Sequence, residues 1–323
     1  MIKTFLLVSL LIGNSVGAVS KNPADRDLLL KLRQAKTTDN TEIKKFLEKT
    51  LKADPENGKL TLLMVACALG DLNSVNYLTN NSVIESDNEA LVNVSGLKDI
   101  LINRDIEIKE QEKAYLRYQS ESGYTALTFA VVAGNYEVVK YLLEFSENDF
   151  KTRLTKEFKK LSSTQNIDPE SEAEIRAKEL VAEYVNKLDY SEWNSVAYAA
   201  SFTPFGLTKD KISDRVNIMN LLVANGAINI TVTVNEGPRD LIGLASRAGN
   251  YYIIEYFKEL YRITSQNEFF KYTIEQKVGT KEEIKNSITL SIADIKLITE
   301  KKQDNLSYYE QTLKILNEWL LNL

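Results

Sequence analysis

The segment that decides the fold is Gly123-Tyr-Thr-Ala-Leu-Thr-Phe-Ala-Val-Val-Ala-Gly-Asn-Tyr-Glu-Val-Val-Lys-Tyr-Leu-Leu143. Gly134-Asn135 predicts a turn between two short helices. Small Ala130 lies in the first helix, and the second carries aliphatic residues at helical spacing: Val138, Val139, Leu142 and Leu143. A helix pair of this size cannot bury its apolar faces alone, so neighbouring pairs must stack.

The same pattern recurs along the chain. Leu60–Leu78 matches it without a gap, and Asp240–Phe257 repeats its alanine, glycine and aliphatic positions. A fourth copy is split into Asn194–Ala200 and Val216–Ala227 by an insertion within 201–215. Small residues at matching places let helices approach closely: Ala66, Ala130, Ala199 and Ala245. The sequence therefore predicts an all-α solenoid of helical repeats.

These repeats resemble the ankyrin family, in which a turn, a Thr-Pro-Leu-His start, a pair of alanines and a Gly-His turn recur. Thr125 is the strong match, and Gly226-Ala227 closes the split copy as in the family. The histidine that follows the threonine in the family is replaced in all four copies, by Met64, Thr128, Ala197 and Gly243. The resemblance implies that losing this hydrogen-bonding side chain weakens the turn network and makes these repeats less stable.

The remaining segments surround the repeats. We expect a repeat region over 58–258, interrupted by helical insertions at about 80–122, 146–192 and 201–215. Degenerate repeats hidden in the first two gaps are the alternative. A helix pair within 19–57 suits an N-terminal helical cap, and the helical, polar-rich segment 259–323 suits a C-terminal helical cap, because terminal units need one solvated face. The apolar stripe that ends the chain also allows a coiled-coil partner helix.

Residues 1–18 have the pattern of a signal peptide: Lys3, a short apolar run, and small residues up to Ala18. We place cleavage after Ala18, which predicts an exported protein, periplasmic or secreted. An uncleaved anchor or a buried first helix is the alternative. No later stretch has the apolar length of a membrane span.

Composition excludes several classes of function. The 323 residues include no histidine and one cysteine, which excludes histidine-based triads, histidine-ligated metals and intramolecular disulfides. The net charge of −5 is of the wrong sign for a nucleic-acid binder. An acidic cluster at Glu170, Glu172 and Glu174 fits a helix first turn, and Cys67 fits a packed thiol. We expect no enzyme, no cofactor and no metal.

The resemblance also implies a partner-binding surface. In ankyrin domains the residue before the motif threonine and those after the alanine pair face a concave groove. Among the matching positions, five have side chains of the types enriched in interfaces: Tyr124, Trp193, Phe202, Arg239 and Arg247. The alternative is that the insertions fold over the groove and that its aromatic residues are ordinary core.

The sequence thus predicts an exported protein–protein interaction module. The Lys-, Asn- and Ile-rich composition resembles that of AT-rich bacterial genomes, which leads to the hypothesis of a host-directed factor of an intracellular bacterium. Two alternatives belong to other classes: a structural or inhibitory helical protein with an occluded groove, and a histidine-free helical enzyme with its site in the insertions.

Overall fold

The computed structural model describes residues 62–81, 119–120, 123–161, 168–235, 237–265, 279–301 and 304–323. The expected signal peptide, the expected N-terminal cap and most of the first gap lie outside these residues. The chain divides into two compact units: unit 1 holds Met1–Leu142 and Asp189–Ser191, and unit 2 holds Leu143–Leu188 and Glu192–Leu323.

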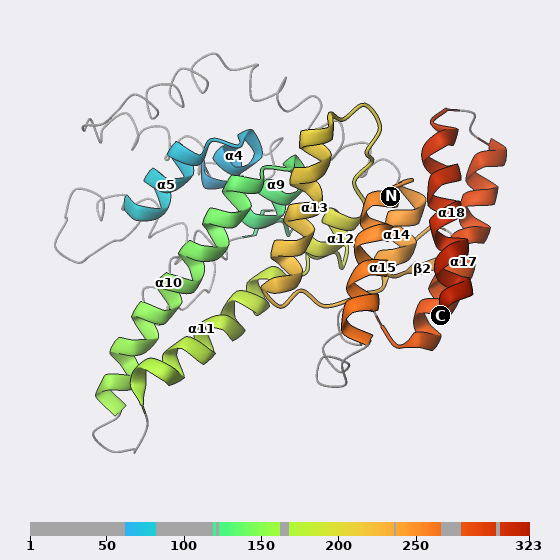
Figure 1. The fold of residues 1–323 in the computed structure, drawn as a ribbon. Helices are drawn as coiled ribbons and strands as arrows, with labels where there is room; N and C mark the ends of the chain where they lie inside the picture. Colours follow the sequence, from blue (N-terminus) through green and yellow to red (C-terminus); the bar gives the residue numbers. More distant parts are fainter. Residues whose placement is uncertain are drawn as a thin grey trace, which may run out of the picture. The chain divides into compact units, whose positions relative to one another are not determined.

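The described residues of unit 1 form two helix pairs, α4 (Leu62–Leu69) with α5 (Leu72–Asn81) and α9 (Ala126–Ala133) with α10 (Tyr136–Leu161), of which α10 continues into unit 2. Helix α4 packs along α9, as Figure 1 shows. The side chains of Ala66 and Ala130 are fully buried, so these helices approach closely as the sequence predicted.

The start of α9 explains how a repeat persists without the family's histidine. The Thr125 hydroxyl accepts a hydrogen bond from the Thr128 backbone N–H, and the Thr128 hydroxyl accepts one from the Thr125 N–H. This capping box satisfies backbone donors that helix formation leaves open. Thr128 stands where the family has histidine, so in this copy a hydroxyl restores part of the network that we expected to be weak.

Unit 2 continues the pattern with α12 (Ser195–Ala200), α13 (Lys209–Ala224), α14 (Leu241–Arg247) and α15 (Tyr251–Ser265). A last pair follows, α17 (Lys281–Lys301) and α18 (Leu306–Asn322). Helices α12, α14 and α17 pack in one row, and α13, α15 and α18 pack in a second (Figure 1). The last pair therefore extends both rows of the stack.

Two segments depart from a simple helix pair. Helix α10 has 26 residues where α5 has 10, and α11 (Pro169–Val185) packs against its distal part, with Lys151 Nζ 2.7 Å from Glu174 Oε2. Helix α13 begins at Lys209, earlier than the expected Val216, because Thr208 caps it. The insertion in 201–215 is thus a loop plus added helical turns.

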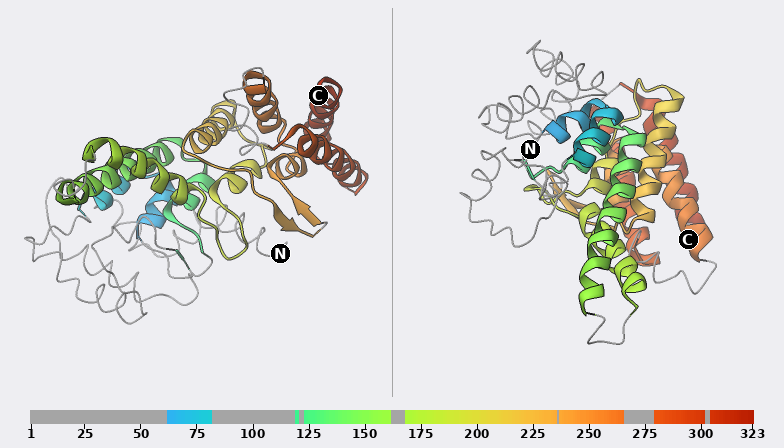
Figure 2. Two further views of the ribbon diagram at one scale, coloured as in Figure 1. Left: turned by 90° about the horizontal axis from the view of Figure 1, so that it is seen from below. Right: turned by 90° about the vertical axis from the view of Figure 1, so that its left-hand side faces the viewer.

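A short hairpin precedes α14. Strands β1 (Val232–Val234) and β2 (Gly237–Arg239) pair antiparallel, with Val232 opposite Arg239, and the hairpin projects from the helices of unit 2 (Figure 2). Among the described residues, none of the helices is both long and apolar enough to cross a membrane.

Neighbouring pairs are linked by the asparagine that follows the turn glycine. Asn135 Nδ2 donates to the Cys67 carbonyl at 2.8 Å, and Asn250 Nδ2 donates to the Phe202 carbonyl at 3.1 Å. Both acceptors belong to the first helix of the preceding pair or to the residues just after it. Asn250 is fully buried and also accepts the Ile253 N–H at the start of α15.

We expect Asn250→Ala to lower the free energy of unfolding by about 2–3 kcal/mol, because it leaves a buried carbonyl unpaired and removes a helix cap. Urea denaturation followed by circular dichroism measures the change. Asn217→Ala, on an exposed face of α13, is the matched control and should leave stability nearly unchanged. Equal effects of the two substitutions would contradict the inter-repeat role of Asn250.

Candidate partner-binding surface

The five predicted groove residues are divided between the units. Tyr124 belongs to unit 1, and Trp193, Phe202, Arg239 and Arg247 belong to unit 2. Tyr124 is half-buried, and its ring meets Phe129 edge to face at 5.7 Å between centroids. The hydroxyl of Ser120 accepts the Tyr124 N–H at 3.1 Å, which fixes the backbone just before the Thr125 cap. Part of this side chain remains available to a partner.

Trp193 and Phe202 are buried, at 8% and 9% exposure. The Trp193 ring packs against Tyr198 of α12 at 5.1 Å between centroids. Over the Phe202 ring lies the Arg215 guanidinium, 5.3 Å from the centroid, and burial lowers the pKa of Arg215 to about 10. Arg215 and Phe202 both belong to the segment 201–215, so this contact lies within the expected insertion.

Arg239 is the most constrained of the five. Its side chain is 8% exposed and makes two hydrogen bonds to Asp294 of α17, from Nε to Oδ2 at 2.6 Å and from Nη2 to Oδ1 at 2.8 Å. Its Nη1 donates to the Pro238 carbonyl. A bidentate pair of this kind fixes both position and orientation. Arg239 thus ties the strand before α14 to the last helix pair.

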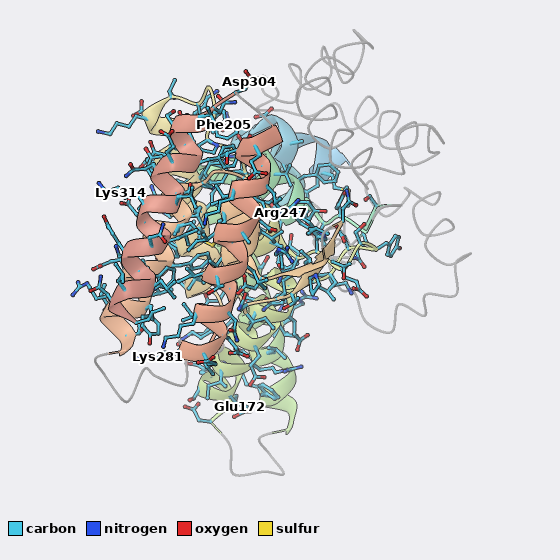
Figure 3. All side chains as sticks on the ribbon, turned by 90° about the vertical axis from the view of Figure 1, so that its right-hand side faces the viewer. Glu172, Phe205, Arg247, Lys281, Asp304 and Lys314 are labelled. Atoms are coloured by element: carbon cyan, nitrogen blue, oxygen red, sulfur yellow. The ribbon has the colours of Figure 1, made fainter. Side chains whose placement is uncertain are left out.

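Arg247 converges on the same carboxylate from the end of α14. Its Nη1 lies 3.2 Å from Asp294 Oδ2, and its side chain keeps 22% of its surface exposed. The Tyr309 hydroxyl of α18 donates to the Arg247 carbonyl at 3.3 Å. Figure 3 shows Arg247 beside α17. The structure therefore brings Arg239 and Arg247 together around one acid.

The pKa values of the two carboxylates at this contact, Asp294 and Asp240, shift in opposite directions. Burial alone would raise the pKa of Asp294, but hydrogen bonds and charge from Arg239 and Arg247 outweigh it and hold that pKa below its usual range. Burial raises the pKa of Asp240, partly offset by hydrogen bonds from Ser287 and the Gly243 N–H. The two arginines therefore favour the ionised form of Asp294.

Sequence analysis missed Asp294, Ser287 and Tyr309. Each lies on the last helix pair, which lacks the alanine and glycine landmarks of the repeats. A signal was present, because an acid at Asp294 interrupts a helix face that otherwise buries Ile284, Ile288 and Ile295. A buried acid within such a face calls for a cationic partner.

The other candidate chemistries find little support. Hydrogen bonds from Lys151 and Lys178 lower the pKa of Glu174 to about 2, which makes it a poor general acid or base at neutral pH. The Cys67 side chain is fully buried, and burial raises its pKa, so it is held as a thiol. Across the described ranges, no group of three acidic or cysteine side chains is placed to hold a metal ion.

Comparison with known families matches residues 43–154 to the sequence model described as ankyrin repeats (3 copies). Residues 43–154 of the chain are therefore identified as ankyrin repeats. The matched region includes α4, α5, α9 and most of α10, and the ankyrin match agrees with the mostly helical fold predicted from the sequence. A search of curated proteins found no match.

Ankyrin repeats serve as protein–protein interaction modules and in general are not enzymes. Within this chain, the residues that the family resemblance assigned to the groove differ in how exposed their side chains are. Trp193, Phe202 and Arg239 are engaged by other parts of the chain, whereas Tyr124 and Arg247 keep exposed surface. Their role in binding stays a prediction.

We expect Arg239→Ala to destabilise the protein by about 3–5 kcal/mol, because it leaves the buried Asp294 carboxylate without its bidentate partner. Arg247→Ala removes a longer, more exposed contact and should cost less. Urea unfolding of both variants tests this order. Arg262→Ala, which removes an exposed pair with Glu259, is the control and should not move the midpoint. A stable Arg239→Ala variant would contradict a structural role for this arginine.

Proposed function

We propose that this protein is exported and binds a protein partner with the groove-facing side of its repeats, as a host-directed factor of an intracellular bacterium. The observation that carries the binding proposal is the stacking of helix pairs within each unit, α4 on α9 in unit 1 and α12, α14 and α17 in unit 2. Tyr124 is its best described anchor, because it is an aromatic side chain of a type common in interface hot spots and is only half-buried.

A second candidate function has an observation in its favour. Burial of Trp193, Phe202 and Arg239 fits a structural or inhibitory module in which the chain covers its own groove. The two candidates differ in what Tyr124 does. A binding module needs this side chain for affinity, whereas a closed structural module does not.

We expect the full chain, immobilised and exposed to host and bacterial envelope lysates, to retain a protein partner. Tyr124→Ala should reduce its retention at least tenfold, which corresponds to about 1.4 kcal/mol. Tyr190→Ala, at a tyrosine of unit 1 that is 72% exposed, is the matched control and should retain the partner. Equal retention by both variants, or no retained protein, would favour the structural candidate.

Export has a separate test. Expressed in a bacterium with its N-terminal segment, the chain should appear outside the cytoplasm. Its mass should be that of a chain whose first residue is Val19. Ala18→Phe should block this cleavage, because signal peptidase sites require small residues, and Ala24→Phe should not. Cytoplasmic, uncleaved protein from the unaltered chain would overturn the export proposal.

A further inference from the structure

The contact between α14 and α17 differs in chemistry from the contact between α4 and α9. Fully buried aliphatic and small side chains dominate the earlier contact. At the later one, Arg239, Asp240 and Arg247 meet Ser287 and Asp294 through ion pairs and hydrogen bonds. Two of these five residues are the predicted groove arginines. The last helix pair therefore holds side chains that the family resemblance assigns to partner binding.

Gly243 makes this arrangement fit. A Cβ atom at this position would lie 3.0 Å from Arg239 Cδ and 3.1 Å from its Cβ, so the arginine stem passes directly over the glycine. Gly243 stands where the ankyrin family has its histidine. Loss of that side chain leaves the space through which Arg239 reaches α17.

Helix α17 has the pattern of a helix that docks in a groove. Ile284, Ile288 and Ile295 are fully buried along one face, and Ser287 and Asp294 supply the polar contacts on it. These isoleucines stand at i, i+4 and i+11, which keeps them on one helix face, as the i, i+3, i+4 and i+7 anchors of groove-binding helices do in other proteins. The recognition of α17 thus combines an aliphatic stripe with one carboxylate held by two arginines.

The last helix pair also contains buried polar atoms that lack a hydrogen-bond partner. Within the described part of the chain, three buried side-chain atoms lack a hydrogen-bond partner, and two of them, Ser291 Oγ and Trp319 Nε1, belong to α17 and α18. An unpaired buried polar atom weakens the state that contains it, and a buried ion pair adds little net stability compared with apolar packing. These features make the α17–α18 pair easier to replace by another helix than a helix pair that is held by apolar contacts alone.

We propose that α17–α18 is a resident, autoinhibitory occupant of the α14 face, and that an amphipathic helix of a partner, with a carboxylate in the place of Asp294, displaces it and takes over Arg239 and Arg247. Charge complementarity selects this partner chemistry, because the two arginines converge on one carboxylate position. This inference rests on the proposed partner-binding function and names the segment that a partner must replace.

The test uses the full chain and a labelled peptide of residues 281–301, which carries the recognition pattern. Fluorescence anisotropy should show that the peptide binds Asp294→Asn chain at least tenfold more tightly than unaltered chain, because the altered resident helix competes less well. A peptide with Asp294→Asn should lose at least tenfold in affinity. A peptide with Glu300→Gln, at an exposed acid of the same helix, is the matched control and should bind as the unaltered peptide does.

Hydrogen exchange gives a second readout that does not depend on any natural partner. Peptide binding should lower amide protection in α17 and α18 together, while α12 and α14 keep theirs. Gly243→Ala should lower protection of α17 in the same direction, because its Cβ forces the Arg239 stem to shift by a few tenths of an ångström and lengthens its contact with Asp294. A peptide that binds neither chain, or binds regardless of its carboxylate, would overturn the proposal. The proposed binding function would not be overturned by that result, because its own test is the loss of partner retention in Tyr124→Ala.

Discussion

The structure depends on hydrogen bonds that asparagine side chains make from one helix pair back to the pair before it. Each pair has too small a core to hold itself, so its stability comes from its neighbours. Asn135 and Asn250 convert this general requirement into a fixed register, because each must reach one particular carbonyl of the preceding pair. The adjacent glycine, at φ +76° in Gly134 and +65° in Gly249, turns the chain so that the amide points the right way. Apolar packing supplies the driving force, and these amides supply the alignment.

The absence of histidine is accommodated differently in each repeat. Helix starts need an acceptor for their first backbone N–H groups, and Thr125, Asn194 and Asp240 all provide one. The position three residues later is then free to diverge. It carries a hydroxyl in Thr128, a buried methyl in Ala197, and in Gly243 a gap that another side chain fills. The repeats retain the capping interaction and vary the residue that accompanies it.

Sequence reasoning found what is local and repeated. The alanine positions, the glycine turns and the aliphatic faces recur at fixed spacing, so α4, α9, α10, α12, α14 and α15 were predictable from single segments. The start of α13 was missed although Thr208 and Asp210 carried an ordinary helix-start signal, because comparison with the other repeats directed attention to Val216. The ion pair of Arg239 with Asp294 could not be predicted from the sequence, because 55 residues separate its partners and α17 shares no landmark with the repeats. The covering of Phe202 by Arg215 likewise depends on how the loop folds.

The buried cysteine of α4 makes local opening of this part of the protein measurable. Cys67 is the chain's sole thiol, its side chain has no exposure, and its carbonyl accepts the Asn135 amide. A thiol reagent can reach it only after the packing around α4 has opened. The rate of alkylation therefore measures how often the packing around α4 opens. No label or mutation is needed, and no second thiol in the chain reacts.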